Sequence, residues 1–312
     1  MACLSDGRHL YHYYRDRYSI GLLRDLSRYD KEGLSIAALK RSNYAQLLQK
    51  PRVKAAMATL GNRPTGDDWF YHDYDEQQEV FVLTLGVWGG EKGNSRRWEQ
   101  TSRPGCNLVL QMNFAGEHDA LYAKLKAEYA PFGCFNHPIS EKRHTLAWAR
   151  LDIDFEHNCA LIEEIQNDWL RDVKWFEKRV MGKLKAGDAP DSKTNLWDVN
   201  CSLKTAQSYC RFVLGRYAPI WDEAMLWAAI SFLREEIGIR DIFYHSVDSG
   251  RLLKRIGGRL PPNSIYTDLP RRFCFAPTDE APEFLRKEKR FQKVKKSHPK
   301  LSFFKLPELQ VV

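Results

Sequence analysis

The order of elements between residues 144 and 275 constrains the fold more than any other feature. Two strand-like runs, HTLAWARLDID and CALIEEIQND, come first, and the strongly apolar helix WDEAMLWAAISFLREEIGI follows about fifty residues later. The strand DIFYHSV, the short segment SGRLLKRIGG and a last strand around RRFCF come after it. Because short β-rich runs flank one apolar helix, we expect an α+β fold. Its sheet would be mixed and mostly antiparallel, with a central buried helix and a small-molecule or peptide cleft where strands part.

The other segments divide the chain into three regions. Apolar residues recur at helical intervals within residues 5–60, which predicts a helical N-terminal region over 1–66. The runs VFVLTLGVW and CNLVLQMNF predict two further strands, and we expect the glycine-rich link at 89–105 to be a mobile hairpin loop. The α+β core would span 67–280 with a helical insertion at 167–215, and a basic C-terminal tail would occupy 281–312.

The positive charge of the chain is concentrated near its C-terminus. The formal net charge is +8, from 48 Lys and Arg against 40 Asp and Glu. Residues 285–305 hold nine Lys and Arg and one Glu, so this segment alone carries a net +8 and the remainder is neutral. We therefore expect any electrostatic attraction to an acidic partner to come from this segment.

The cysteines and the hydropathy indicate an intracellular protein. The seven cysteines are odd in number and widely spaced, and no CxxC motif occurs, which is typical of a reduced cytoplasmic chain. The N-terminal segment MACLSDGRHL has no apolar stretch of the signal-peptide type. The longest apolar run is also too short to cross a bilayer, so we expect a cytoplasmic protein without membrane contact.

The segment CALIEEIQND places two carboxylates on a probable strand. Strand alternation puts Glu163 on the same apolar face as Cys159, Leu161 and Ile165, where burial is expected to raise its pKa into the range of a general base. Glu164 shares the opposite face with Gln166 and, if the strand continues, Asp168, which indicates a substrate cleft at the end of the strand. The alternative is that one glutamate pairs with a basic residue and the other is solvated.

The segment RFVLGRYAP, before the apolar helix, is a candidate anion-binding approach. The free N–H groups at a helix N-terminus attract phosphate. The candidate residues for holding a pyrophosphate group are Arg211, Gly215, Arg216, Tyr217 and Trp221.

Polar residues near the last strands give further candidates. His245 ends a strand and is followed by Asp248 and Ser249. These three residues would form a nucleophilic site, or, as is more usual, Asp248 or Ser249 would cap the next helix. Tyr266 and Arg271 lie in a proline-rich segment that would line a groove or simply close the sheet. No histidine shows metal-ligand spacing with a carboxylate, so we predict no metal.

The basic segment at 281–300 is expected to form a helix with a thin apolar seam. Dense Lys and Arg favour nucleic acid or an acidic protein as a partner, and a solvated surface is the alternative. The candidate contact residues are Arg286, Lys287, Lys289, Arg290, Lys293, Lys295 and Lys296.

The element order resembles that of the GNAT-type N-acetyltransferases over roughly residues 80–275. In that family a strand with a catalytic carboxylate precedes a pyrophosphate loop and a long helix, and a further strand and a short helix follow. CALIEEIQND, RFVLGRYAP, the apolar helix, DIFYHSV and GRLLKRIGG stand in that order here. The resemblance implies acyl transfer from acetyl-CoA or another acyl-CoA to an amine, with Glu163 or Glu164 as base. Tyr266 would be the acid or a substrate contact.

Two other functions are compatible with the sequence. The segment EIQNDW, followed by the W-x-E-A-type helix that begins at Trp221, also resembles domains of phage and mobile-element polyvalent proteins. The same fold would then be a non-catalytic module that binds nucleic acid through its basic segment. An inhibitor or effector that binds another protein is a third possibility.

Overall fold

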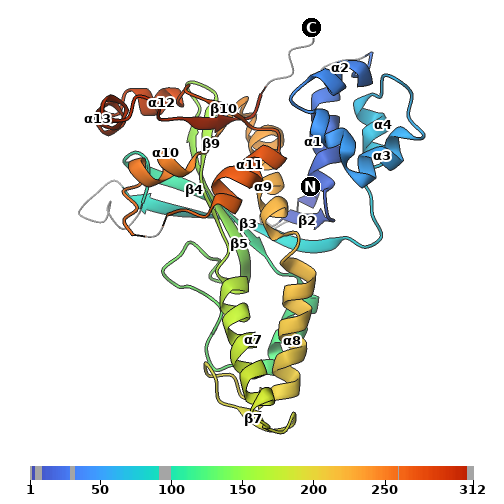
Figure 1. Ribbon diagram of the computed structural model, residues 1–312, viewed down its shortest axis with the longest axis vertical. Helices are drawn as coiled ribbons and strands as arrows, with labels where there is room; N and C mark the ends of the chain where they lie inside the picture. Colours follow the sequence, from blue (N-terminus) through green and yellow to red (C-terminus); the bar gives the residue numbers. More distant parts are fainter. Residues whose placement is uncertain (1, 4–8, 29–31, 91–99, 259, 308–312) are drawn as a thin grey trace.

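The computed structural model describes residues 2–3, 9–28, 32–90, 100–258 and 260–307, and it shows a mixed sheet of nine strands in this part of the chain. The strand order is β1-β2-β3-β4-β5-β6-β9-β11-β10 (Figure 1). The neighbours β6 and β9 run parallel, and the other described neighbours run antiparallel. The predicted α+β class with a mostly antiparallel sheet is confirmed. The strands are β1 (Ala2–Cys3), β2 (His9–Tyr13), β3 (Glu79–Gly90), β4 (Gly105–Asn113), β5 (Thr145–Asp154), β6 (Cys159–Gln166), β9 (Asp241–His245), β10 (Ala276–Thr278) and β11 (Phe303–Lys305).

The apolar helix predicted at the centre is α9 (Trp221–Ser231), which continues as a wider turn, η3 (Phe232–Ile237). It is buried almost all round because it packs on β5 and β6 on one side and on α1 (Arg17–Ser27) on the other. Gly238 ends it with a φ of 80°, as its position predicts. Among the described helices, none combines the length and the apolar character needed to cross a membrane.

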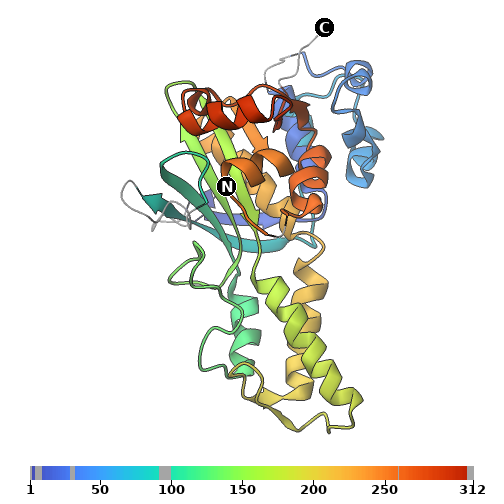
Figure 2. The same ribbon diagram turned by 60° about the vertical axis from the view of Figure 1, so that its left-hand side comes forward.

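The opposite face of the sheet is covered by α10 (Val247–Leu253), α12 (Glu283–Arg286) and α13 (Lys289–Ser297) (Figure 2). A second apolar cluster lies between these helices and the sheet. It consists of Cys159, Leu161, Phe243, Leu253, Ala281, Phe284, Leu285, Phe291, Leu301 and Phe303. The helices on the two faces bury both sides of the central strands, which explains why β6 reads as a nearly continuous apolar run.

The N-terminal extension is helical from Arg17 onward, but the segment before it is a strand. Its helices are α1, α2 (Ile36–Arg41), η1 (Ala45–Gln49), α3 (Pro51–Met57) and α4 (Gly66–Tyr71). Tyr11 and Tyr13 in β2 are buried at a spacing of two and pair with β3. The prediction of helix for this segment is therefore wrong, because strand alternation and pairing with β3 bury both rings.

The predicted helical insertion at 167–215 is confirmed. It consists of α7 (Trp169–Lys185), the short strands β7 (Lys193–Thr194) and β8 (Cys201–Ser202), and α8 (Leu203–Tyr217). Helices α7 and α8 lie side by side and project away from the sheet (Figure 1). Helix α6 (Gly116–Tyr122), followed by η2 (Ala123–Leu125), packs at the base of this pair.

The C-terminal region differs from its prediction at two places. RRFCF is not a strand, because Leu269–Arg272 is helix α11, preceded by η4 (Ser264–Asp268). The basic segment does form helices, but it is not a free tail: β11 lies between β9 and β10 and buries Phe303 and Phe304. The centre of the predicted hairpin loop at 89–105, residues 91–99, lies outside the described residues.

Replacing Gly21 of α1 with alanine is expected to lower the free energy of unfolding by about 1–3 kcal/mol, as overpacking of a core does. A Cβ at Gly21 would lie 2.1 Å from Cζ2 of the buried Trp227, so the indole would have to move. The matched control is Gly182→Ala in α7, where a Cβ meets no atom within 4 Å. That variant should gain about 0.5–1 kcal/mol from its higher helix propensity. If denaturant unfolding gave the same change in the free energy of unfolding for both variants, the predicted clash between a Cβ at position 21 and Trp227 would be contradicted.

Candidate functional site

The candidate site lies where the pairing between the parallel strands β6 and β9 ends. They are paired from Cys159 opposite Asp241 to Ile162 opposite Tyr244, and their register ends there. A bulge in β6 sits at this point: Glu164 is opposite Arg150 and Ile162 is opposite the next residue of β5, so Glu163 is the extra residue. Bulges redirect side chains next to functional sites. The register ends here because β9 itself stops at His245, whose Nε2 lies 3.1 Å from Glu163 Oε2 of β6, so the divergence beside α9 stays a prediction.

The bulge also changes which face each residue of β6 occupies. Strict alternation would place Ile165 with Leu161, but Ile165 and Ile162 belong to the same apolar cluster and Leu161 belongs to the other. The predicted sharing of one apolar face by Glu163 and Ile165 is wrong, because the extra residue resets the alternation.

Glu163 is fully buried and its carboxylate is saturated with hydrogen bonds. The backbone N–H of Ser102 donates to Oε1 at 3.0 Å, and the Ser102 hydroxyl donates to Oε2 at 2.9 Å. Nε2 of His245 lies 3.1 Å from Oε2 and 2.9 Å from Ser102 Oγ, and Nδ1 lies 2.9 Å from Ser249 Oγ. Ser249 is also part of the capping box at the start of α10, as the capping interpretation predicts.

A second cluster surrounds Glu164 and is centred on the buried ammonium of Lys254. Its Nζ donates to Tyr266 Oη at 2.9 Å, to the Glu163 carbonyl at 3.1 Å and to Glu164 Oε2 at 3.2 Å. Arg150 from β5 forms a further ion pair with Glu164. The side chain of Glu164 is 16% exposed, whereas that of Glu163 is completely covered. Glu164 is therefore the carboxylate that a substrate can reach.

The pKa of Glu163 is lowered to about 2, opposite to the predicted direction. Burial by itself raises this pKa, but the hydrogen bond with His245 and the positive charges of Lys254 and Arg150 outweigh it. The pKa of Glu164 is lowered for a similar reason: burial opposes the shift, and Lys254 and Arg150 dominate. Burial lowers the pKa of His245. Both carboxylates are thus ionised and His245 is neutral near pH 7.

Gln166 and Asp168, predicted as substrate contacts, form a separate group at the end of β6. Gln166 Nε2 donates to Asp168 Oδ1 at 2.7 Å, and His137 Nδ1 lies 2.6 Å from Asp168 Oδ2. Arg171 pairs with the same carboxylate at 3.0 Å. Arg271, also predicted as a substrate contact, is exposed on α11, where its carbonyl accepts a hydrogen bond from Gln46.

The segment predicted as a pyrophosphate loop is the last part of helix α8. Arg211 and Gly215 are exposed on this helix, and Tyr217 is buried against Phe81 and Phe114. The interpretation as a loop is wrong, because α8 continues to Tyr217, whose ring is buried against Phe81 and Phe114.

The charges around this segment do not suit a pyrophosphate. Arg216 is already paired with Glu79 at 2.6 Å and with Glu117 at 2.7 Å. The first turn of α9, which begins at the half-buried Trp221, carries Asp222 and Glu223, and both pair with Arg272. Carboxylates at a helix N-terminus occupy the place that an anion would take.

A basic cluster lies beside Lys254 and includes one of the predicted nucleic-acid contacts. Arg290 of α13 donates to the Leu252 carbonyl at 2.9 Å. Burial and the charge of Arg255 lower the pKa of Arg290 to about 10, while the negative charge of Glu163 opposes this. Nε of Arg251 is buried without a hydrogen-bond partner among the described residues. Clustered cations with an unused donor favour an anionic ligand.

The structure thus brings Glu163, Glu164, His245 and Tyr266 together, and it adds three residues that the sequence did not predict. Ser102, Arg150 and Lys254 are far apart along the chain, in the segment before β4, in β5 and at the end of α10. No spacing rule connects them, and a buried lysine in a short helix carries no local signal. Comparison of the chain with protein-family models, with curated proteins and with solved structures finds no match.

Proposed function

We propose that the protein is a GNAT-like acyltransferase that transfers an acyl group from acyl-CoA to an amine. The observation that carries the proposal is the parallel pair β6–β9, whose pairing ends beside a bulged, buried glutamate and whose two strands are connected through the central helix α9. This is the order of strand, helix, strand and short helix that the sequence resemblance implies. The ionised carboxylates and the polar groups at the end of this pairing support chemistry at that point rather than simple packing.

In this proposal Glu164 accepts the proton of the attacking amine, because its side chain is partly exposed whereas that of Glu163 is not. The new bond joins the amine nitrogen to the acyl carbon, and the bond from that carbon to sulfur breaks. Tyr266 gives its proton to the leaving thiolate, and Lys254, 2.9 Å away, stabilises the resulting phenolate. Glu163, Ser102 and His245 are positioning residues whose mutual hydrogen bonds link the ends of β6 and β9.

The phosphates of the acyl donor would be held by Arg251, Arg255 and Arg290. The unpartnered Nε of Arg251 and the mutual repulsion of Arg255 and Arg290 support this assignment. The residues at the end of α8 that the sequence predicts for this role are unsuited to bind the phosphates, because Asp222 and Glu223 lie in the first turn of the next helix, α9. This basic cluster adjoins α10, the same short helix that positions Lys254.

Calorimetry with acetyl-CoA tests the proposal. We expect saturable binding that weakens about 10–100-fold in Arg290→Ala, since a hydrogen bond to a charged group contributes about 1.5–3 kcal/mol. The matched control is Arg211→Ala, an exposed arginine of α8 that should bind as tightly as the unmodified chain. Thiol release with an amine acceptor should fall in Glu164→Gln while acetyl-CoA binding persists. Absence of binding at millimolar acetyl-CoA by the folded protein would remove this function.

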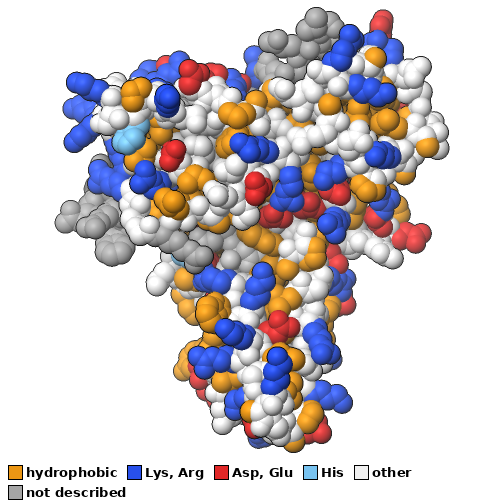
Figure 3. Space-filling model, viewed as in Figure 1, with side chains coloured by type: hydrophobic (Ala, Val, Ile, Leu, Met, Phe, Trp, Pro, Cys, Tyr) orange, Lys and Arg blue, Asp and Glu red, His pale blue; other side chains and the backbone are white. Residues whose placement is uncertain are grey.

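A second candidate function, binding of nucleic acid, is favoured by the surface of α13. Lys287, Lys289, Lys293 and Lys296 are exposed on α13 and just before it, and Figure 3 shows Lys and Arg side chains gathered at that end of the molecule. Arg286 pairs with Glu280 and Glu283, and Lys295 donates to the Leu301 carbonyl, so these two are less available. Binding of this kind would weaken steeply with salt.

A further inference from the structure

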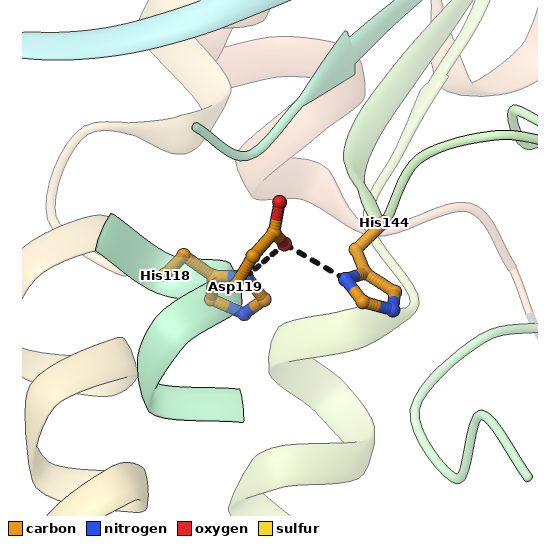
Figure 4. Close-up of side chains that lie close together, drawn as sticks. All are labelled: His118, Asp119 and His144. Carbon is orange, nitrogen blue, oxygen red and sulfur yellow. Dashed lines mark hydrogen bonds and ion pairs between the residues drawn. The ribbon is translucent and has the colours of Figure 1, made fainter. Parts of the chain in front are cut away.

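A second cluster of chemically active side chains lies at the base of the α7–α8 pair, away from the end of the β6–β9 pairing. It consists of His118 and Asp119 on α6 and His144 just before β5, and all three side chains point toward one another (Figure 4). Asp119 Oδ1 lies 2.9 Å from His144 Nδ1 and 3.3 Å from His118 Nδ1. Two imidazole nitrogens and a carboxylate oxygen therefore face one point.

From this arrangement we infer a binding site for a divalent transition metal ion such as Zn²⁺, with His118, Asp119 and His144 as ligands. These ligand atoms lie within 4.8 Å of one another. Tetrahedral ligands at about 2.0–2.1 Å from zinc are about 3.4 Å apart, so the ion fits between them after small side-chain adjustments. Two histidines and one carboxylate are a donor set used in catalytic zinc sites.

The surroundings of His118 are those of a fixed metal ligand. The ring is fully buried and stacks on Phe114, with ring centroids 3.6 Å apart. Its second nitrogen, Nε2, lies 3.0 Å from Tyr209 Oη, which itself accepts a hydrogen bond from Trp169 Nε1 at 2.9 Å. A metal-ligating histidine commonly donates its other N–H to such a partner, which orients the lone pair of the ligating nitrogen.

The open side of the site faces a cavity of about 280 Å³. Asp119 and His144 lie at its wall, and their side chains are 45% and 32% exposed. Lys142, Arg143 and Trp169 also line it. Three protein ligands beside a cavity leave a position for water or for a small anionic ligand of the metal.

Charge distinguishes this cluster from one of the two other groups of possible ligands in the described part of the chain, and burial distinguishes it from the other. The carboxylate of Asp168, near Cys134 and His137, is already paired with Arg171 at 3.0 Å. The group of Asp154, Glu156 and His157 lies at the surface turn between β5 and β6. Among the described residues Asp119 has only His118 and His144 as ion-pair partners and no Lys or Arg, so its carboxylate is not already neutralised by a fixed cation.

Titration of the chelator-treated chain with Zn²⁺ by calorimetry, and with Co²⁺ by visible absorption, tests the inference. We expect one metal ion per chain with a micromolar or tighter Kd. Tyr209→Phe should weaken binding about 10–100-fold, as loss of an outer partner does, and His144→Ala and Asp119→Asn should weaken it more. Circular dichroism of each metal-free variant checks its fold, and Asp119→Asn preserves the side-chain shape if His144→Ala unfolds.

The matched controls are His137→Ala and His157→Ala, which change a histidine in each of the other groups and should leave the Kd unchanged. Absence of saturable binding by the folded chain would overturn the inference. Binding that survives both His144→Ala and Asp119→Asn, or that is lost in either control, would equally overturn it. These measurements need no acyl donor, so they are independent of the proposed acyltransferase activity.

Discussion

Lys254→Met is expected to lower the free energy of unfolding by about 3–5 kcal/mol, the cost of removing one partner from a buried ion pair. The ammonium supplies donors to the Glu163 carbonyl, to Glu164 and to Tyr266, and a methionine supplies none. Glu164 would keep only Arg150 as a charged partner from this cluster. Denaturant unfolding monitored by fluorescence measures the loss.

Two variants make this result specific to the buried cluster. Lys287→Met, at an exposed position before α13, should change the free energy of unfolding by less than about 0.5 kcal/mol. In a double-mutant cycle, Lys254→Met combined with Glu164→Gln should cost less than the sum of the single changes, because both members of the pair are then neutral. A cost equal to the sum would show that the two side chains do not interact.

A chain that ends at residue 300 is expected not to fold. It lacks β11, which pairs with both β9 and β10 and buries Phe303 and Phe304. Loss of a buried phenylalanine costs about 3–5 kcal/mol, and two such losses approach the whole stability of an ordinary domain. Circular dichroism and thermal unfolding of the shortened chain would show the loss of the cooperative transition.

The matched control neutralises the basic surface without removing the strand. Replacing Lys287, Lys289 and Lys293 with glutamine should leave the thermal transition nearly unchanged, because these side chains are exposed. If this variant still loses affinity for nucleic acid and its salt dependence flattens, the second candidate function gains support. A shortened chain that melts like the full one would contradict the structural role of β11.

Several elements of the fold could be predicted from local patterns. The apolar helix α9, its end at Gly238, and the strands β3, β4, β5, β6 and β9 follow from hydrophobic periodicity and from turn residues. The residues of the candidate site could be predicted in part, because Glu163 and Glu164 lie within one such strand and His245 ends another. Side-chain position along a strand is a local property, which is why these three could be named in advance.

The partners of those residues, and so their chemistry, depend on the tertiary structure. Lys254 and Arg150 reach Glu164 from other elements. The hydrogen bond with His245, together with the charges of Lys254 and Arg150, reverses the pKa shift that burial of Glu163 alone predicts. The bulge at Glu163 arises from pairing with β5, and β2 is a strand because β3 lies beside it. His144 meets Asp119 only after β5 and α6 have packed.

The sequence by itself determined the class of the fold, the central helix and the location of the positive charge, because each follows from residues that are close together in the chain. Only the tertiary structure decided which charges neutralise one another and that the basic segment closes the sheet. Coulomb energies and strand pairing depend on distances between residues that are far apart in sequence. The hydrophobic periodicity of a segment does not determine those distances.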